Sequence, residues 1–255
     1  MLYVGTGNGY TAPVPATSDA VLAIALDTGK ILWSKQLLAN DASVSNCRPR
    51  DGVAKSETCP EDEGPDSDFG NPPMIRTLPS GRTLIVIGQK SGDAWALDPD
   101  RQGEIVWHRM VGPATGGGGM LWGSAADNEQ AYFPVTSRQR TEPIGLAAVK
   151  LTTGELAWHA SPPVGSAAPD AVIPGVVFSG ANNGTMYAYS TIDGHMLWQF
   201  DTNKDFSTVN GVAARGGSLN GSGPVVSGGM LYVPSGYADL GGGIRGNVLL
   251  AFGVQ

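Results

Sequence analysis

Four short segments of this sequence repeat one pattern, in which a tryptophan stands four residues after a turn glycine. They are DTGKILW ending at Trp33, QGEIVW ending at Trp107, TGELAW ending at Trp158 and DGHMLW ending at Trp198. Successive tryptophans are 107 − 33 = 74, 158 − 107 = 51 and 198 − 158 = 40 residues apart, and a polar insert over residues 39–68 lengthens the first spacing. The underlying period of about 40 residues matches one blade of a β-propeller.

Composition decides between a propeller and a helical repeat of the same length. The chain has 37 glycines and 18 prolines in 255 residues and only 15% charged residues, which is too rich in turns and too poor in surface-helix residues for a helical solenoid. A fifth unit begins at Met230, and the repeat is cut at both ends. We therefore predict an all-β chain, one partial propeller domain over residues 1–255 with about four and a half blades, in which the repeated tryptophans pack one blade on the next.

Charge and hydropathy exclude two classes of partner. The formal net charge is −7, so the basic footprint of a nucleic-acid-binding protein is absent. The longest apolar runs, such as residues 20–26, are strand-sized and far below the roughly 20 residues of a membrane span. Because residue 2 already begins a strand, no signal peptide is recognised, and we interpret Met1 as a truncation or an internal start.

The two cysteines and three histidines do not have metal-ligand spacing. Cys47 and Cys59 are 59 − 47 = 12 residues apart in the polar insert, which favours a disulfide over metal or redox chemistry and indicates an oxidising, periplasmic or extracellular compartment. His108 and His159 directly follow a repeat tryptophan, and His195 precedes one. We expect all three on the surface of the third strand of their units.

The repeat also predicts where a site lies. The strand that we take as the first of each unit is followed by a polar residue at corresponding positions, namely Asn8, Lys90, Asn182 and Tyr237. Equivalent strand ends of a propeller lie on one face around the central channel. Residues of different chemistry there predict one composite site built from several blades.

Six segments resemble one known family. GTGN (5–8), SDAVLAIALDTGKILW (18–33), DSDFG (66–70), GQKSG (88–92), GGGGMLWG (116–123) and GNVLLAF (246–252) occur in the order found in the pyrroloquinoline-quinone-dependent alcohol dehydrogenases, whose fold is an eight-bladed propeller with tryptophan docking motifs. The insert ending CPEDEGPDSDFG and the segment ARGGSLNGSGP (214–224) resemble the polyvinyl alcohol dehydrogenase branch.

The resemblance assigns roles to four residues. Asn8 matches an amide ligand of a calcium ion, and Asp19 matches the general base, which we also place at the metal. These assignments are chemically consistent. A hard cation such as Ca²⁺ can bind an amide oxygen, and a carboxylate beside it can accept the proton of the alcohol. Lys90 matches the cation that faces the quinone oxygens, and Trp122 matches an aromatic residue near the cofactor.

Each assignment has a structural alternative. Asp66 and Asp68 match the family's acidic pair, with no role beyond lining or ordering the pocket. Asn8 is also a typical turn residue, Asp19 could cap its loop, Lys90 could be a solvated turn lysine, and Asp68 could close an Asx turn.

The leading hypothesis is the C-terminal half of a periplasmic quinoprotein dehydrogenase. It would oxidise an alcohol, with polymeric and secondary alcohols as candidates, pass hydride to pyrroloquinoline quinone activated by Ca²⁺, and pass electrons to a cytochrome c. The competing hypothesis is a non-catalytic tryptophan-repeat propeller that serves as a scaffold for other proteins. A third is a fragment that folds but is inactive.

Overall fold

The computed structural model describes residues 1–44, 47, 57–112, 118–137, 144–238 and 243–253, and these contain β-strands and one short 3₁₀-helix but no α-helix. The strands form antiparallel sheets in which neighbours in the chain are neighbours in the sheet. None of the described residues forms a helix with the length and hydrophobicity that crossing a membrane requires. The all-β prediction is confirmed.

Three of the sheets are complete four-stranded blades. Their strands are β4 (Met74–Thr77), β5 (Thr83–Gly88), β6 (Asp93–Asp98) and β7 (Glu104–Met110); β8 (Ala125–Ala126), β9 (Gln130–Val135), β10 (Gly145–Lys150) and β11 (Leu156–Ala160); and β12 (Ala171–Ile173), β13 (Val176–Gly180), β14 (Thr185–Ser190) and β15 (Met196–Asp201). The 3₁₀-helix η1 (Pro99–Arg101) joins β6 to β7.

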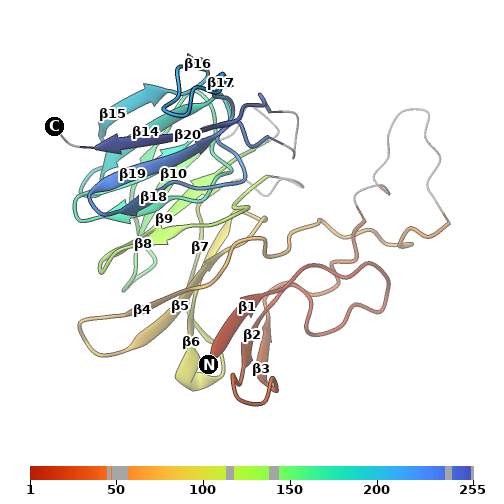
Figure 1. Ribbon diagram of the computed structural model, residues 1–255. Coiled ribbons are helices and arrows are strands. Elements are labelled where there is room, and N and C mark those ends of the chain that lie inside the picture. The colour runs from red at the N-terminus through yellow and green to blue at the C-terminus, as the bar shows by residue number, and fades with distance from the viewer. Residues whose placement is uncertain (45–46, 48–56, 113–117, 138–143, 239–242, 254–255) are drawn as a thin grey trace.

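Two three-stranded sheets and one small hairpin complete the described chain. The strands are β1 (Leu2–Gly5), β2 (Ala20–Ile24) and β3 (Ile31–Gln36); β18 (Val225–Ser227), β19 (Met230–Ser235) and β20 (Val248–Gly253); and the hairpin pair β16 (Asp205–Phe206) and β17 (Ala214–Arg215). In Figure 1 the five larger sheets follow one another as successive blades, from the red sheet at the N-terminus to the blue sheet at the C-terminus. Three complete and two three-stranded blades agree with the predicted four and a half.

The order of strands within a blade differs from our prediction. The strand expected to be first is the second of each four-stranded sheet, because β4, β8 and β12 precede it, and in the last blade β18 precedes β19. The fifth unit thus begins at Val225 rather than at Met230. These extra strands have only two to four residues, too few to show an alternating apolar pattern.

The repeated tryptophans join consecutive blades, as predicted. The glycine of the turn before the last strand adopts the left-handed conformation, with φ +75° at Gly103 and +73° at Gly154. Because glycine has no Cβ, the preceding blade's tryptophan can lie against it: a Cβ would come within 2.9 Å of the Trp33 ring at Gly103 and 2.8 Å of the Trp107 ring at Gly154. Trp107 Nε1 also donates to the carbonyl oxygen of Leu151 at 2.7 Å.

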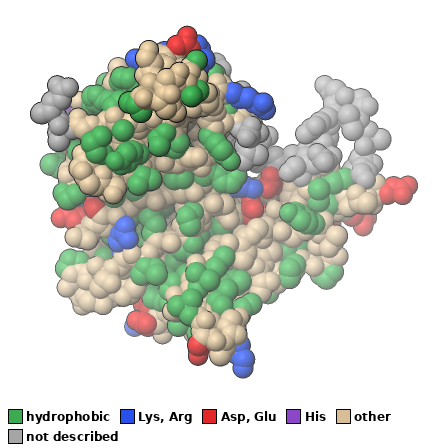
Figure 2. Space-filling model, viewed as in Figure 1, with side chains coloured by type: hydrophobic (Ala, Val, Ile, Leu, Met, Phe, Trp, Pro, Cys, Tyr) green, Lys and Arg blue, Asp and Glu red, His purple; other side chains and the backbone are tan. Residues whose placement is uncertain are grey.

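Hydrophobic clusters fill the space between the blades. The largest contains buried residues from the second and third blades, including Leu84, Phe133 and Val149, and the other clusters join the first and second, third and fourth, and fourth and fifth blades. Figure 2 shows hydrophobic side chains interspersed with other residues over the face in view, with charged groups scattered among them. The core therefore lies between sheets, as expected for a propeller.

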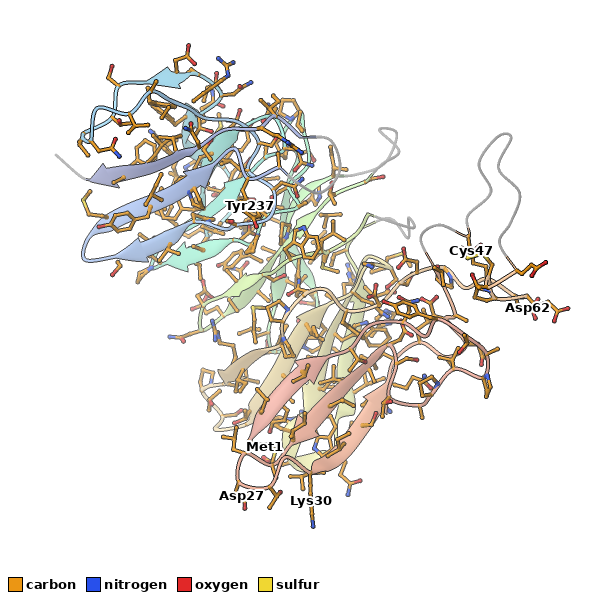
Figure 3. All side chains as sticks on the ribbon, turned by 45° about the vertical axis from the view of Figure 1, so that its right-hand side comes forward. Met1, Asp27, Lys30, Cys47, Asp62 and Tyr237 are labelled. Carbon is orange, nitrogen blue, oxygen red and sulfur yellow. A yellow bond between two sulfur atoms is a disulfide. The ribbon has the colours of Figure 1, made fainter. Side chains whose placement is uncertain are left out.

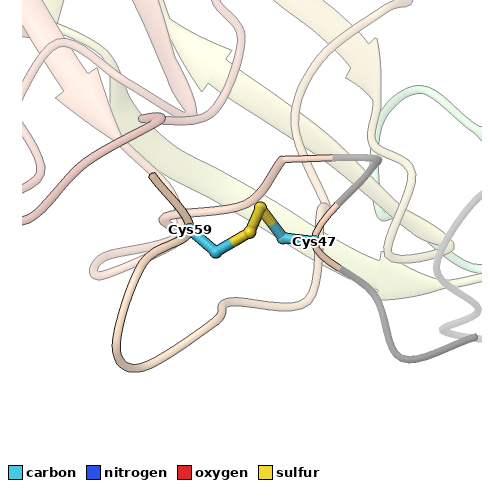
Figure 4. Close-up of a disulfide and its surroundings, with 2 residues drawn as sticks. All are labelled: Cys47 and Cys59. Carbon is cyan, nitrogen blue, oxygen red and sulfur yellow. A yellow bond between two sulfur atoms is a disulfide. The ribbon is translucent and has the colours of Figure 1, made fainter. Parts of the chain in front are cut away.

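The predicted disulfide between Cys47 and Cys59 is present, with a Cα to Cα distance of 5.5 Å (Figure 4). Figure 3 shows that the insert carrying Cys47 and Asp62 extends away from the sheets, on a different side of the molecule from the turn of Asp27 and Lys30. The disulfide thus links two residues of the insert, outside the blades.

Candidate functional site

The candidate site lies where the ends of β1 and β5 meet the start of β2 and the last residues of the insert. The backbone N–H of Asp19 donates to the Gly7 carbonyl oxygen at 3.0 Å, and the backbone N–H of Lys90 donates to the Asp68 carbonyl oxygen at 3.2 Å. Gly7 also lies against Asp68, since a Cβ on it would be 3.5 Å from Asp68 Oδ2. Four stretches that are distant in sequence thus converge on one place.

Lys90 forms ion pairs with two carboxylates at this place. Its Nζ lies 3.1 Å from Asp66 Oδ1 and also contacts Asp68 Oδ1. The three side chains are partly exposed, at 21% for Lys90, 16% for Asp66 and 15% for Asp68. Burial lowers the pKa of Lys90, but the two carboxylates outweigh it and raise the pKa above its usual value. Lys90 is therefore a fixed positive charge at the edge of the site and not a solvated turn lysine.

Asp19 is enclosed within the same region. It has no exposed surface and a left-handed backbone, with φ +48°. Neither carboxylate oxygen has a hydrogen-bond partner among the described residues. Burial raises the pKa of Asp19 to about 7, and the neighbouring carboxylates of Asp41 and Asp68 add to the rise, while the Ser18 side chain and Lys90 oppose it. The residue is a buried carboxyl group that titrates near neutral pH.

Asn8 uses the nitrogen of its amide to hold the insert. Nδ2 donates to the carbonyl oxygen of Ser43 at 2.6 Å and to that of Gly9 at 2.7 Å. Among the described residues, no donor reaches Asn8 Oδ1, so the amide oxygen is available to a cation.

Trp122 lies beside the segment that carries the acidic pair. Its Cζ3 would be 4.0 Å from a Cβ on Gly70, two residues after Asp68. Trp122 Nε1 is buried and has no acceptor among the described residues. An indole N–H in this situation is unusual, and a bound group that accepts a hydrogen bond would explain it.

The donor set fits part of a calcium site. The Asn8 amide oxygen and the two Asp19 oxygens are hard ligands of the kind that Ca²⁺ selects. Among the described residues, neither Asp19 oxygen has a hydrogen-bond partner. The part of the chain that the structure describes has no group of three or more histidine, cysteine, aspartate or glutamate side chains that could hold a metal ion. The two predicted ligands would therefore contribute to a larger ligand set.

The remaining predicted strand ends are separate from this place. The Asn182 carbonyl oxygen accepts a bond from Ser218 Oγ at 2.5 Å, and Tyr237 forms a bridge with Leu219. These two ends therefore meet each other through the segment around Leu219, whereas Gly7, which precedes Asn8, and Lys90 both lie against Asp68. The contacts thus group the four predicted ends into two different environments.

The histidines lie elsewhere on the strands than expected. His108 is in β7 and His159 is in β11, which are fourth strands, and His195 is in the turn before β15. The difference follows from the extra strand at the start of each blade. His108 and His195 are exposed and pair with aspartates of their own blades, with His108 Nε2 2.6 Å from Asp93 Oδ1.

One residue of the site was missed by the sequence reasoning. Asp41 is completely buried at the start of the insert, and its carboxylate accepts bonds from the backbone N–H groups of Asp66 at 3.0 Å and Ser67 at 2.6 Å. Its neighbours in sequence are Asn40 and Ala42, a context typical of an exposed turn, so no signal marked it.

Comparison with known proteins gives relatives along the whole chain. The chain is 40% identical over 279 residues to a polyvinylalcohol dehydrogenase of Pseudomonas sp. and 36% identical over 287 residues to one of Sphingopyxis sp. strain 113P3. Both alignments cover 100% of this chain, which spans 42% and 43% of the lengths of those relatives. A family model described as outer membrane protein assembly factor BamB matches residues 145–252.

A solved structure supports the fold. The europium-containing methanol dehydrogenase superposes with a TM-score of 0.64 over 96% of this chain and 49% of its own, at 16% identity. The partial β-propeller is thus confirmed. The resemblance to polyvinyl alcohol dehydrogenases is likewise confirmed over the full length of this chain.

Proposed function

We propose that the protein carrying this chain oxidises an alcohol, with polymeric or secondary alcohols as the substrate class. The similarity to two polyvinylalcohol dehydrogenases supports the reaction type. The observation that carries the proposal is the ion pair of Lys90 with Asp68, a partly exposed base beside a fixed cation at the end of a blade strand. The disulfide supports a periplasmic or extracellular location.

Oxidation of an alcohol removes one proton from oxygen and one hydride from carbon. Pyrroloquinoline quinone, when bound, supplies the hydride acceptor, and Ca²⁺ supplies a Lewis acid beside it. Asn8 Oδ1 and the Asp19 carboxylate would help to hold the cation. A cytochrome c is the proposed acceptor of the electrons afterwards.

Asp68 is the better placed of the two candidate bases. A general base must come within hydrogen-bond reach of the proton that it takes. Asp68 is 15% exposed, whereas Asp19 has no exposed surface. We therefore transfer the role of proton acceptor to Asp68 and keep Asp19 as a metal-holding carboxyl group.

Lys90 has two roles in this arrangement. Its ammonium group pairs with the Asp66 and Asp68 carboxylates. It would also supply positive charge to a bound group that is being reduced. Trp122, which lies near Gly70 just after the acidic segment, would contribute an apolar wall and one N–H donor.

The test uses the complete reading frame that contains this chain, supplied with calcium and the quinone, with reduction of an artificial electron acceptor as the readout for several alcohols. Asp68→Asn should lower kcat about 10²-fold or more, since the proton acceptor is lost. Asp19→Asn should lower it less, and addition of excess calcium should restore part of the rate.

Two outcomes would contradict the proposal. An unchanged rate in Asp68→Asn with a complete loss in Asp19→Asn would return the role of base to Asp19. A protein that binds neither quinone nor calcium and oxidises none of the alcohols would favour the scaffold hypothesis, to which the BamB family match gives support.

A further inference from the structure

We propose that Asp41 is a positioning residue that holds the Asp66–Asp68 segment in register with Lys90; this inference rests on the proposed function of that pair. The carboxylate of Asp41 is completely buried, and it accepts hydrogen bonds from backbone N–H groups of this segment. It acts instead on the backbone directly before Asp68.

The contact has the form of a clamp on two consecutive amides. Asp41 Oδ1 accepts the N–H of Asp66 at 3.0 Å and Oδ2 accepts the N–H of Ser67 at 2.6 Å. Hydrogen bonds from backbone N–H groups to a buried carboxylate are charge-assisted and stronger than neutral ones. Both oxygens of one side chain thus fix the direction in which the chain enters Asp68.

The backbone at Asp66 needs such a restraint. Its φ is +60°, in the left-handed region that residues other than glycine seldom adopt. The same residue places its Oδ1 3.1 Å from Lys90 Nζ. Without the bond to its N–H, Asp66 would relax towards a commoner conformation and its carboxylate would leave Lys90.

Asp41 is itself anchored to the strand end that carries Asn8. The Asp41 carbonyl oxygen accepts the N–H of Gly9 at 3.0 Å, and the N–H of Gly64 donates to the Ala42 carbonyl oxygen at 2.8 Å. A Cβ on Gly64 would lie 2.7 Å from Asp41 Cα, so the returning end of the insert packs directly on the clamp. The clamp therefore links both ends of the insert to the end of β1.

The main test measures the environment of Lys90 rather than activity. In the complete protein, the rate of acetylation of Lys90 at a fixed alkaline pH is compared with that of Lys35 by mass spectrometry. Asp41→Asn keeps the volume of the side chain but replaces one carboxylate oxygen with an NH₂ group. That group cannot accept the backbone N–H bond that the oxygen accepted. Lys90 should lose its carboxylate partners, and its labelling rate relative to Lys35 should rise about threefold to tenfold.

Asp98→Asn is the matched control. Asp98 is also a buried aspartate that accepts a backbone N–H, but its partners are Asp100 and Arg82 in the second blade. This variant should lose stability without changing the labelling ratio. A ratio that rises equally in both variants would mean general loosening and would overturn the positioning role.

Activity gives a second, separable readout. If the protein oxidises alcohols, Asp41→Asn should lower kcat about tenfold or more with a smaller change in KM, because a shift of about 1 Å in a catalytic group is costly. If the protein has no such activity, the labelling ratio still decides the role of Asp41. An unchanged ratio together with an unchanged kcat would refute it.

A measurement on the unsubstituted protein covers the case in which Asp41→Asn does not fold. The amides of Asp66 and Ser67 should exchange with solvent about 10²-fold or more slowly than an open loop amide. Exchange at the rate of an open loop would show that the clamp does not hold in solution and would overturn the proposal.

Discussion

The second and fourth blades share one architecture but bury polar groups in different ways. In the second blade, Arg82 Nη2 lies 2.8 Å from Asp98 Oδ2, and Lys90 at the end of β5 pairs with acidic groups of the insert. In the fourth blade, Asp170 is enclosed at the start of β12 with no hydrogen-bond partner for either oxygen among the described residues. The corresponding strand end there carries the neutral side chain of Asn182.

The difference shows which part of the molecule supplies chemistry. The strands place the residues that follow β5 and β13 at equivalent positions, so architecture alone cannot explain why only one of them is charged and paired. The acidic partners of Lys90 come from the insert between β3 and β4. In the proposed site, the connection between two blades therefore supplies the acidic partners, while the blade strand fixes the position of Lys90.

The prediction with the largest expected effect compares substitutions at these two strand ends, Lys90 and Asn182. Lys90→Met removes the ammonium group that contacts both Asp66 and Asp68, and it should lower kcat for alcohol oxidation about 10² to 10³-fold. Asn182→Leu at the equivalent end should change kcat by less than about threefold, since its side chain faces no charge of the site. Steady-state kinetics on both variants of the complete protein measure the contrast, and equal losses would show that the two ends form one site.

The sequence predicted the blades better than the site. The glycine and tryptophan of each repeat are local signals: Gly154 adopts a left-handed turn and Trp107 fills the space that it leaves, so the spacing alone reveals the architecture. Strands of two or three residues such as β8 carry no such signal. The enclosure of Asp19 could not be predicted either, because it depends on the insert that packs over it from 20 or more residues away.

A smaller effect tests the charged pair of the second blade. Asp98 accepts bonds from Arg82 and from the backbone N–H of Asp100, and Asp98→Asn should lower the free energy of unfolding by about 1–2 kcal/mol at pH 7. Burial opposes the shift, but Arg82 and the backbone bond hold the pKa of Asp98 below its ordinary value of 3.8. The folded protein therefore binds this proton less readily than the unfolded chain.

The pH dependence of that difference has a definite sign. Because the folded pKa is lowered, the stabilisation by Asp98 is complete above the unfolded pKa and is lost as the pH falls through the folded pKa. Urea unfolding at pH 7 and at pH 3 should show the gap between the natural protein and Asp98→Asn narrowing at the lower pH. A gap that widens in acid would mean that the ion pair does not stabilise the fold.

The smallest effect is expected for the neutral carboxyl group of Asp170 in the fourth blade. Its contribution to the free energy of unfolding should fall by about 1 kcal/mol between pH 4 and pH 5, which is the opposite pH dependence to that of Asp98. Burial raises the pKa of Asp170 well above its ordinary value of 3.8, so this group stays protonated in the folded protein while the unfolded chain ionises. Its stabilising contribution is therefore complete below about pH 4 and is lost as the pH rises towards the folded pKa. Asparagine has nearly the same shape and no proton to lose, so Asp170→Asn should gain stability relative to the natural protein over this interval. Urea unfolding of the two proteins at both pH values measures the change. A constant difference would show that Asp170 ionises in the fold as it does in the unfolded chain, and this contrast between the two blades would fail.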